Sequence, residues 1–154
     1  MYKGRIPFSK KVMSRITGVA VLSSQGNRVT ALVSSPGRLR KVSLDITKRK
    51  QVKSSSAIKG YSRCSQDISV WKSGGSTYLF GSGGGWTSAT SGVVKYRLSG
   101  SRLSRIWTKR ISGECEAVLP ASGALYLVVE GSSTYNRNQV RITENMMNLL
   151  RPIG

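Results

Sequence analysis

The sequence predicts an all-β fold in which a unit of four short strands occurs about three times. Three windows share a short apolar strand, a glycine turn and a second apolar strand, and their turn glycines, Gly26, Gly74 and Gly123, are 48 and 49 residues apart. Between these windows short apolar runs alternate with Gly, Ser and Asn, which is typical of strands joined by tight turns. A helix is indicated only at 143–150, for two turns at most.

The first two strands of each window flank the turn glycine. We expect first strands at 19–22, 68–71 and 117–119, second strands at 29–33, 77–80 and 125–129, and chain breaks at 36–37, Gly81 and Gly131. In the second strands apolar side chains occur at both odd and even positions, as in the run Leu125, Tyr126 and Leu127, so they point to both faces of the strand. Such strands are expected to be covered on both faces.

The third and fourth strands complete each window. They are expected at 40–46 and 51–52, at 93–98 and 103–107, and at 140–142 and 149–150. In the third strand of the second window, Val94 and Leu98 lie on one face, and Lys95 and Arg97 lie on the other. This alternation predicts a half-exposed strand.

One stretch carries a recognisable pattern. Residues 75–81 read GSTYLFG, and residues 92–107 read GVVKYRLSGSRLSRIW. The pattern resembles a generic β-propeller blade repeat, in which a "YV-G" strand, a Gly/Ser-rich loop, "V-KY", a Gly turn and "LLW" follow one another. Residues 114–150 resemble a second copy, and residues 18–52 a weaker third copy. The resemblance implies β-propeller-like four-stranded blade repeats, and it implies no activity.

The domain organisation follows from these repeats. We expect a basic N-terminal arm or strand at 1–17 and a single all-β domain at 18–154, with repeats at 18–52, 67–107 and 114–150. A β-sandwich or jelly roll is the alternative, because regular turn spacing also occurs there. Propellers have about four to eight blades, so three blades leave open edges. A homo-oligomer of two chains would close a six-bladed ring.

The charge of the chain indicates the charge of its partner. The 25 Lys and Arg residues against 6 Asp and Glu residues give a formal charge of +19. Residues 1–110 hold 22 of the cations and two acids, for +20, and residues 111–154 hold three cations and four acids, for −1. So large an excess repels itself unless counterions or an anionic partner neutralise it, and phosphates are the natural choice.

The predicted interface is a basic rim that contacts RNA or DNA backbone, with an aromatic side chain that stacks on a base. The cations at 48–53 and at 102–107 are expected at equivalent outer edges of neighbouring repeats. The predicted nucleic-acid-binding residues are Lys10, Lys11, Arg38, Arg40, Lys41, Lys48, Arg49, Lys50, Lys53, Lys95, Arg97, Arg102, Arg105, Lys109, Arg110 and Trp86.

Catalytic and metal chemistry find little support in the sequence. The chain has no His and only two Cys, so the usual acid–base residue and the usual zinc ligand set are missing. Glu114 and Glu116 are the only closely spaced acids, and they flank Cys115 beside a basic run. We therefore expect no enzyme activity, no metal and no cofactor, and we leave open whether Cys64 and Cys115 form a disulfide.

The first hypothesis for the function is a non-enzymatic structural or adaptor protein of a nucleic-acid-containing assembly, such as a virion or a ribonucleoprotein, with other protein subunits as partners. The second is a protein-interaction or self-assembly module with an acidic partner, and the third is a carbohydrate-binding module that uses Trp86 and Tyr135. No apolar run is long enough to cross a bilayer, and no signal peptide is recognisable. A location inside the cell or inside a particle is expected.

Overall fold

Antiparallel strands account for the regular structure of the protein, for which a computed structural model describes residues 15–62, 64, 66–83, 90–112, 114–121, 124–130 and 140–141. Within these residues, eleven strands form three sheets and no helix is present. The all-β prediction is confirmed. The sheets of the described residues do not join into a closed ring.

Each sheet is an antiparallel meander, in which strands adjacent in the sequence are neighbours in the sheet. The first sheet contains β1 (Gly18–Gln25), β2 (Arg28–Ser35), β3 (Arg38–Asp45) and β4 (Lys50–Ile58). The second contains β5 (Ile68–Ser73), β6 (Ser76–Ser82), β7 (Thr90–Ser99) and β8 (Arg102–Ser112). The third contains β9 (Glu114–Ala121), β10 (Ala124–Glu130) and β11 (Val140–Arg141).

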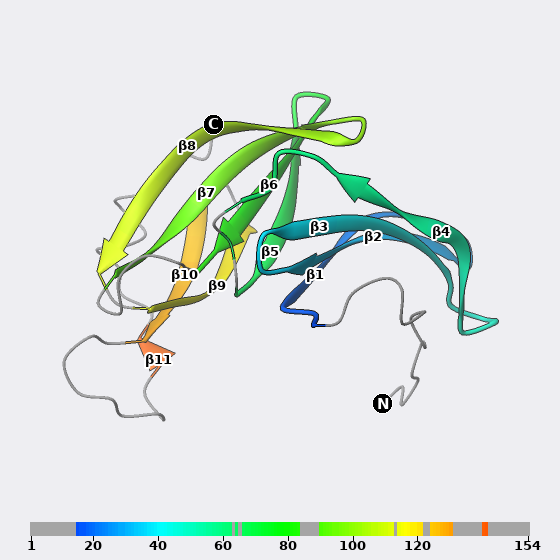
Figure 1. The fold of residues 1–154 in the computed structure, drawn as a ribbon, viewed down its shortest axis with the longest axis horizontal. Coiled ribbons are helices and arrows are strands. Elements are labelled where there is room, and N and C mark those ends of the chain that lie inside the picture. Colours follow the sequence, from blue (N-terminus) through cyan, green and yellow to red (C-terminus); the bar gives the residue numbers. More distant parts are fainter. Residues whose placement is uncertain are drawn as a thin grey trace.

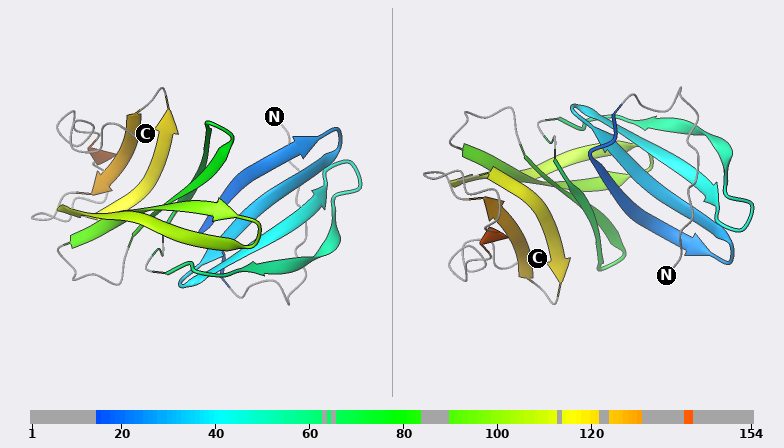
Figure 2. Two further views of the ribbon diagram at one scale, coloured as in Figure 1. Left: turned by 90° about the horizontal axis from the view of Figure 1, so that it is seen from above. Right: turned by 90° about the horizontal axis from the view of Figure 1, so that it is seen from below.

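The three sheets follow one another in space as they do in the sequence. The second sheet, green in Figure 1, lies between the blue first sheet and the orange third sheet, and both views of Figure 2 give the same order. The first strands of successive sheets meet, β1 with β5 and β5 with β9. The last strands of the first two sheets, β4 and β8, are therefore outer edges.

Two apolar clusters hold the sheets together. Between the first and second sheets, Leu32 and Leu39 pack with Ile68, Leu79 and Tyr96. Between the second and third sheets, the cluster consists of Phe80, Val93, Cys115, Val118, Leu125 and Leu127, with Trp71, Tyr78 and Trp107 packed against it. Burial of large side chains of this kind stabilises a fold by roughly 1.5–3 kcal/mol each.

The expectation of a half-exposed third strand is wrong for β7. Val94 and Tyr96 belong to the cluster shared with the first sheet, and Val93, of opposite parity, belongs to the cluster shared with the third. Both faces of β7 are covered over Val93–Tyr96 because its sheet lies between the other two, and the strand is exposed toward its end at Arg97 and Ser99. In the first sheet, the third strand ends at Asp45, so Ile46 lies beyond β3 and is exposed.

The turn glycines act as the sequence indicates. Gly74 and Gly75 are the only residues between the paired Ser73 and Ser76, and their φ angles are 54° and 71°. Two successive positive φ angles are the geometry of a type I′ hairpin turn, which matches the twist of its two strands.

One expected chain break and one expected strand length need correction. Gly81 lies inside β6, which ends at Ser82, and does not break the chain. A side chain at this position would collide with the Cys64 thiol, which accounts for the glycine. The fourth strand of the first sheet runs over Lys50–Ile58 and is much longer than the expected 51–52.

Several predicted segments lie outside the described residues. They are the arm at 1–14, the turn at 122–123, Gly131, and the strand or helix within 143–150. Thr17 is described, and its N–H donates to the Ser34 carbonyl (2.9 Å) just ahead of β1. Nowhere in the described part of the chain is there a helix with the length and apolar character to span a membrane.

Candidate nucleic-acid interface

The outer edges of the first two sheets are joined end to end. Directly after β4, the Lys59 N–H donates to the Ser101 carbonyl (2.9 Å), and the Leu103 N–H donates to the Lys59 carbonyl (2.8 Å). These bonds form a parallel bridge between Lys59 and Arg102 at the start of β8. Figure 1 shows the result, in which β4 and β8 make up the upper contour of the molecule.

This junction depends on Gly60. Its φ angle is 86°, in the left-handed region, and a Cβ there would meet the Leu103 carbonyl. Only glycine supplies both the conformation and the space. The sequence therefore brings the two edges together through one residue without a side chain.

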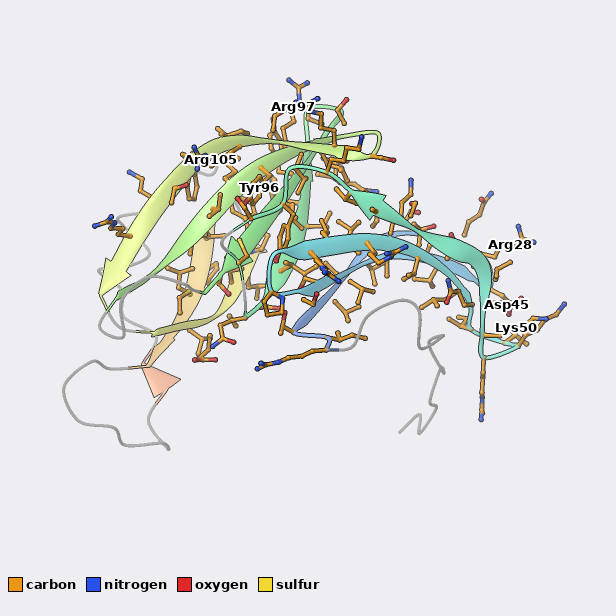
Figure 3. The ribbon with its side chains drawn as sticks, in the orientation of Figure 1. Arg28, Asp45, Lys50, Tyr96, Arg97 and Arg105 are labelled. Atoms are coloured by element: carbon orange, nitrogen blue, oxygen red, sulfur yellow. The ribbon has the colours of Figure 1, made fainter. Side chains whose placement is uncertain are left out.

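Exposed cations follow this continuous edge. We define the basic edge as Lys50, Lys59, Arg102, Arg105, Lys109 and Arg110, all of which are exposed. At ~3.3 Å per residue, the β8 part from Arg102 to Arg110 is about 26 Å long. In Figure 3, Lys50 lies near one end of the contour and Arg105 lies along β8.

Bulges accompany the cations on both edge strands. β8 carries an unpaired residue, Ile106, between Arg105 and Trp107, and β4 breaks its register on either side of Lys53. Bulges and edge cations both hinder the addition of another strand. The basic edge is thus accessible through its side chains rather than through backbone pairing.

An acid lies at one end of the basic edge. Asp45 stands in cross-strand register between Arg28 and Lys50, and Figure 3 shows the three together at the tip of the first sheet. The Asp45 carboxylate accepts a hydrogen bond from the Lys48 N–H (2.8 Å). It therefore organises the turn at 46–49, where Lys48 and Arg49 are exposed.

Other predicted cations lie on inner strands of the sheets. On β3, Arg38 is exposed, and Arg40 and Lys41 are half-buried. On β7, Arg97 is exposed, and its guanidinium donates to the Ser76 hydroxyl (3.1 Å). These residues lie one strand inside the basic edge and do not extend it.

Lys95 does not belong to an exposed rim, which corrects its assignment from the sequence. Its side chain is only 2% exposed, and its ammonium group lies 4.6 Å from the centre of the Tyr78 ring and 5.9 Å from that of Phe80. A cation over aromatic faces is stabilised by the ring quadrupoles. The third sheet covers this face of β7, so phosphate cannot reach the group.

The side chains of five further predicted residues lie outside the described part of the chain. Lys10, Lys11 and Trp86 lie outside the described residues, as does Tyr135, and only the backbone of Lys53 is described, on β4. Conversely, the binding residues predicted from the sequence do not include Lys59, which belongs to the basic edge. The position of Lys59 at the junction depends on the close approach of Gly60 to Leu103, which the sequence does not indicate.

The two cysteine thiols lie in surroundings that suit a structural role. Cys64 and Cys115 are both buried, and no disulfide joins them. Burial raises the pKa of Cys64 to about 11 and that of Cys115 to about 12, which keeps both thiols protonated at neutral pH. Within the described ranges no three acids or thiols lie together as metal ligands would.

The chain matches no protein-family model, and no curated protein is significantly similar to it. Its function is therefore argued from the charge and geometry of the surface itself.

Proposed function

We propose that the protein is a non-enzymatic, strongly basic structural or adaptor component of a nucleic-acid-containing assembly, such as a virion or a ribonucleoprotein. The basic edge binds the phosphate backbone of RNA or DNA. The observation that carries this proposal is the line of six exposed cations along two outer strands and the bridge that joins them end to end. The formal charge of +19 supports it, because an anionic partner would relieve the repulsion among these cations.

The dimensions of the edge suit a nucleic-acid strand. Successive nucleotides of one strand rise by about 3.4 Å along the axis of a duplex, so the ~26 Å of β8 corresponds to roughly seven or eight of them. Lys and Arg contacts to phosphate position a nucleic acid without reading its sequence. The proposed binding is therefore independent of base sequence and open to both RNA and DNA.

The fold assignment can also be refined. We infer that the three sheets are blades of a β-propeller-type arrangement. Successive antiparallel meanders, with their first strands adjacent in space and their last strands on the outside, support this assignment. On this proposal the basic edge is the outer rim of two neighbouring blades. The proposed location is inside the cell or a particle, where nucleic acid is present.

A protein partner is the second candidate function, and exposed apolar side chains favour it. Val19 and Val21, which lie on the same face of β1, are more than half exposed, and apolar side chains grouped on one face indicate a contact surface. Carbohydrate binding stays a prediction, because Trp86 and Tyr135 lie outside the described residues.

Paired substitutions test the basic edge. Arg102→Ser with Arg105→Ser removes two cations from the edge, and Arg15→Ser with Lys72→Ser removes two exposed cations that lie elsewhere. Binding of a labelled oligonucleotide is measured by fluorescence anisotropy at several salt concentrations. The edge variant should lower the magnitude of the salt slope by about 1.4–1.8, at 0.7–0.9 per lost phosphate contact, and the control should leave it unchanged.

Two results would contradict the proposal. Equal losses in both variants would mean that net charge, and not the edge, drives binding. No loss in the edge variant would place the site elsewhere. Exposed substitutions shift stability by only about 0.5 kcal/mol or less each, so thermal unfolding should confirm that both variants are folded.

A further inference from the structure

Trp107 is a large aromatic side chain on the strand that carries most of the basic edge. It lies on β8, the outer strand of the second sheet, and it is only half-buried. It packs against the cluster between the second and third sheets, and its ring centre lies 6.0 Å from that of Phe80, with the two planes tilted by 55°. Packing therefore holds the indole in place while part of it remains open to solvent.

The register of the second sheet explains why this ring is accessible. Phe80 pairs with Lys95, and Lys95 pairs with Trp107, so the three lie in one row on the face that points toward the third sheet. The third sheet packs on that face through β9, which contacts β5, β6 and β7. Phe80 and Lys95 are buried there, whereas Trp107, at the outer end of the row, is only partly covered.

Two cations of the basic edge share this face with Trp107. The β7 residues that pair with Arg102, Trp107 and Lys109 are an even number of positions apart, so all three pairs lie on one face of the sheet. These β7 partners are Ser99, Lys95 and Val93. Both cations are exposed. An accessible aromatic ring thus lies between two exposed cations along the edge strand.

The bulge in β8 produces this arrangement. Trp107 follows Arg102 by five positions, and in a regular strand residues an odd number of positions apart point to opposite faces. The unpaired Ile106 shifts the alternation by one residue and turns Trp107 to the face of Arg102. Ile106 is itself 48% exposed, so the bulge also places an apolar side chain beside the ring.

We infer that the nucleic acid on the basic edge is single-stranded, and that Trp107 stacks on one of its bases while Arg102 and Lys109 contact phosphates on either side. The inference rests on the proposed function and names the form of nucleic acid that the edge binds. Bases in a duplex are stacked on one another, whereas those of a single strand are free to stack on aromatic side chains. Cations alone suit both forms, but an aromatic ring between them contributes only where the faces of bases are accessible.

The spacing along β8 suits a single strand. Lys109 lies two positions beyond Trp107, or about 7 Å, and Arg102 lies about 13 Å before it when the bulged residue is left out. At about 3.4 Å per nucleotide of a stacked strand, these distances correspond to roughly two and four nucleotides. Every base has an aromatic face, so stacking tolerates any sequence. The site therefore agrees with binding that does not depend on base sequence.

Leucine in place of Trp107 tests the inference, because it keeps an apolar side chain for packing and removes the ring. Fluorescence anisotropy measures binding of a labelled single-stranded oligonucleotide and of a duplex of the same sequence. Trp107→Leu should weaken single-strand binding by about 5-fold or more, which corresponds to the loss of one stacked base, and should leave duplex binding unchanged. The salt slope should not change, because no phosphate contact is lost. Trp107→Phe should recover most of the affinity.

Trp71→Leu is the matched control for the loss of packing. Trp71 is also half-buried and packs against the same cluster, but it lies on β5, at the opposite edge of the second sheet from β8. This variant should bind both probes as the wild type does. Thermal unfolding shows whether the two leucine variants are folded.

A second measurement leaves Trp107 in place. Trp71→Phe with Trp86→Phe makes Trp107 the only tryptophan of the chain. A base stacked on its ring should quench its fluorescence, so the single-stranded oligonucleotide should quench it and the duplex should not. This readout decides the matter even where Trp107→Leu does not fold.

Several results would overturn the inference alone. They are unchanged single-strand binding by Trp107→Leu, equal losses with both probes, an equal loss in Trp71→Leu, and equal or absent quenching by the two probes. In each case the proposed function stands as long as affinity still falls with salt. If neither probe binds at low salt, the proposed function is wrong, and the inference falls with it.

Discussion

Asp67 and Ser69 attach the third sheet to the second through a single residue of β9. The Val118 N–H donates to the Asp67 carboxylate (3.3 Å), and the Ser69 hydroxyl donates to the Val118 carbonyl (2.5 Å). Both backbone groups of Val118 are thereby satisfied by side chains from the start of the second sheet. Burial raises the pKa of Asp67 above its ordinary value of 3.8, although two backbone hydrogen bonds oppose this.

The raised pKa of Asp67 predicts a pH-dependent stability. The folded chain binds more protons than the unfolded chain between the two pKa values, so the free energy of unfolding falls as pH rises through that window. Asn at this position does not titrate, and its amide oxygen still accepts from Val118. The free energy of unfolding of the wild type should therefore decline relative to Asp67→Asn as pH rises above 3.8. Chemical denaturation at a series of pH values measures this, and parallel profiles for the two proteins would be inconsistent with it.

The exposure of individual cations was only partly predictable from the sequence. Arg102, Arg105 and Lys109 were predicted to be exposed and are exposed. Lys95 was predicted with them, and it is buried over the Tyr78 ring. Alternation along a strand separates its two faces but does not tell whether another sheet covers the polar one. That depends on the position of the sheet in the stack.

At the scale of strands and turns, the sequence was most informative where glycine and apolar spacing agree. The turns at Gly26 and at Gly74 and their flanking strands follow from the 48-residue spacing. The extent of β4 was not predictable, because residues 54–57 read SSSA and carry no alternation. The break at Gly81 was also wrong, since this glycine makes room for Cys64 rather than ending the strand.

The junction between β4 and β8 gives a prediction at this scale. Gly60→Ala adds a side chain against the Leu103 carbonyl at a φ angle of 86°. Gly26→Ala is the control, because its φ angle is also positive, at 54°, and no atom lies within 4 Å of the added Cβ. The control should cost roughly 1–2 kcal/mol for its backbone conformation alone.

Gly60→Ala should lower the free energy of unfolding by clearly more than the control does, because the collision adds to the conformational cost. Urea denaturation of both variants at one protein concentration measures the difference. Equal losses would show that the close approach at the junction adds nothing to stability.

For the molecule as a whole, charge determined more of the functional hypothesis than the fold did. The +20 of residues 1–110 predicts an anionic partner from composition alone. The arrangement of that charge was only partly predictable. The likeness of the segments at 48–53 and 102–107 placed both at outer edges, but the hydrogen bonds that join these edges through Lys59 arise from tertiary structure.

The dependence of nucleic-acid affinity on salt tests the central proposal most directly. If the six cations of the basic edge contact phosphates of a single strand, log affinity should fall linearly with log salt concentration, with a slope of about −4. Between 50 and 200 mM salt this amounts to a loss of affinity of roughly 300-fold. An affinity that ignores salt over that range, or the absence of any binding at low salt, would contradict the account.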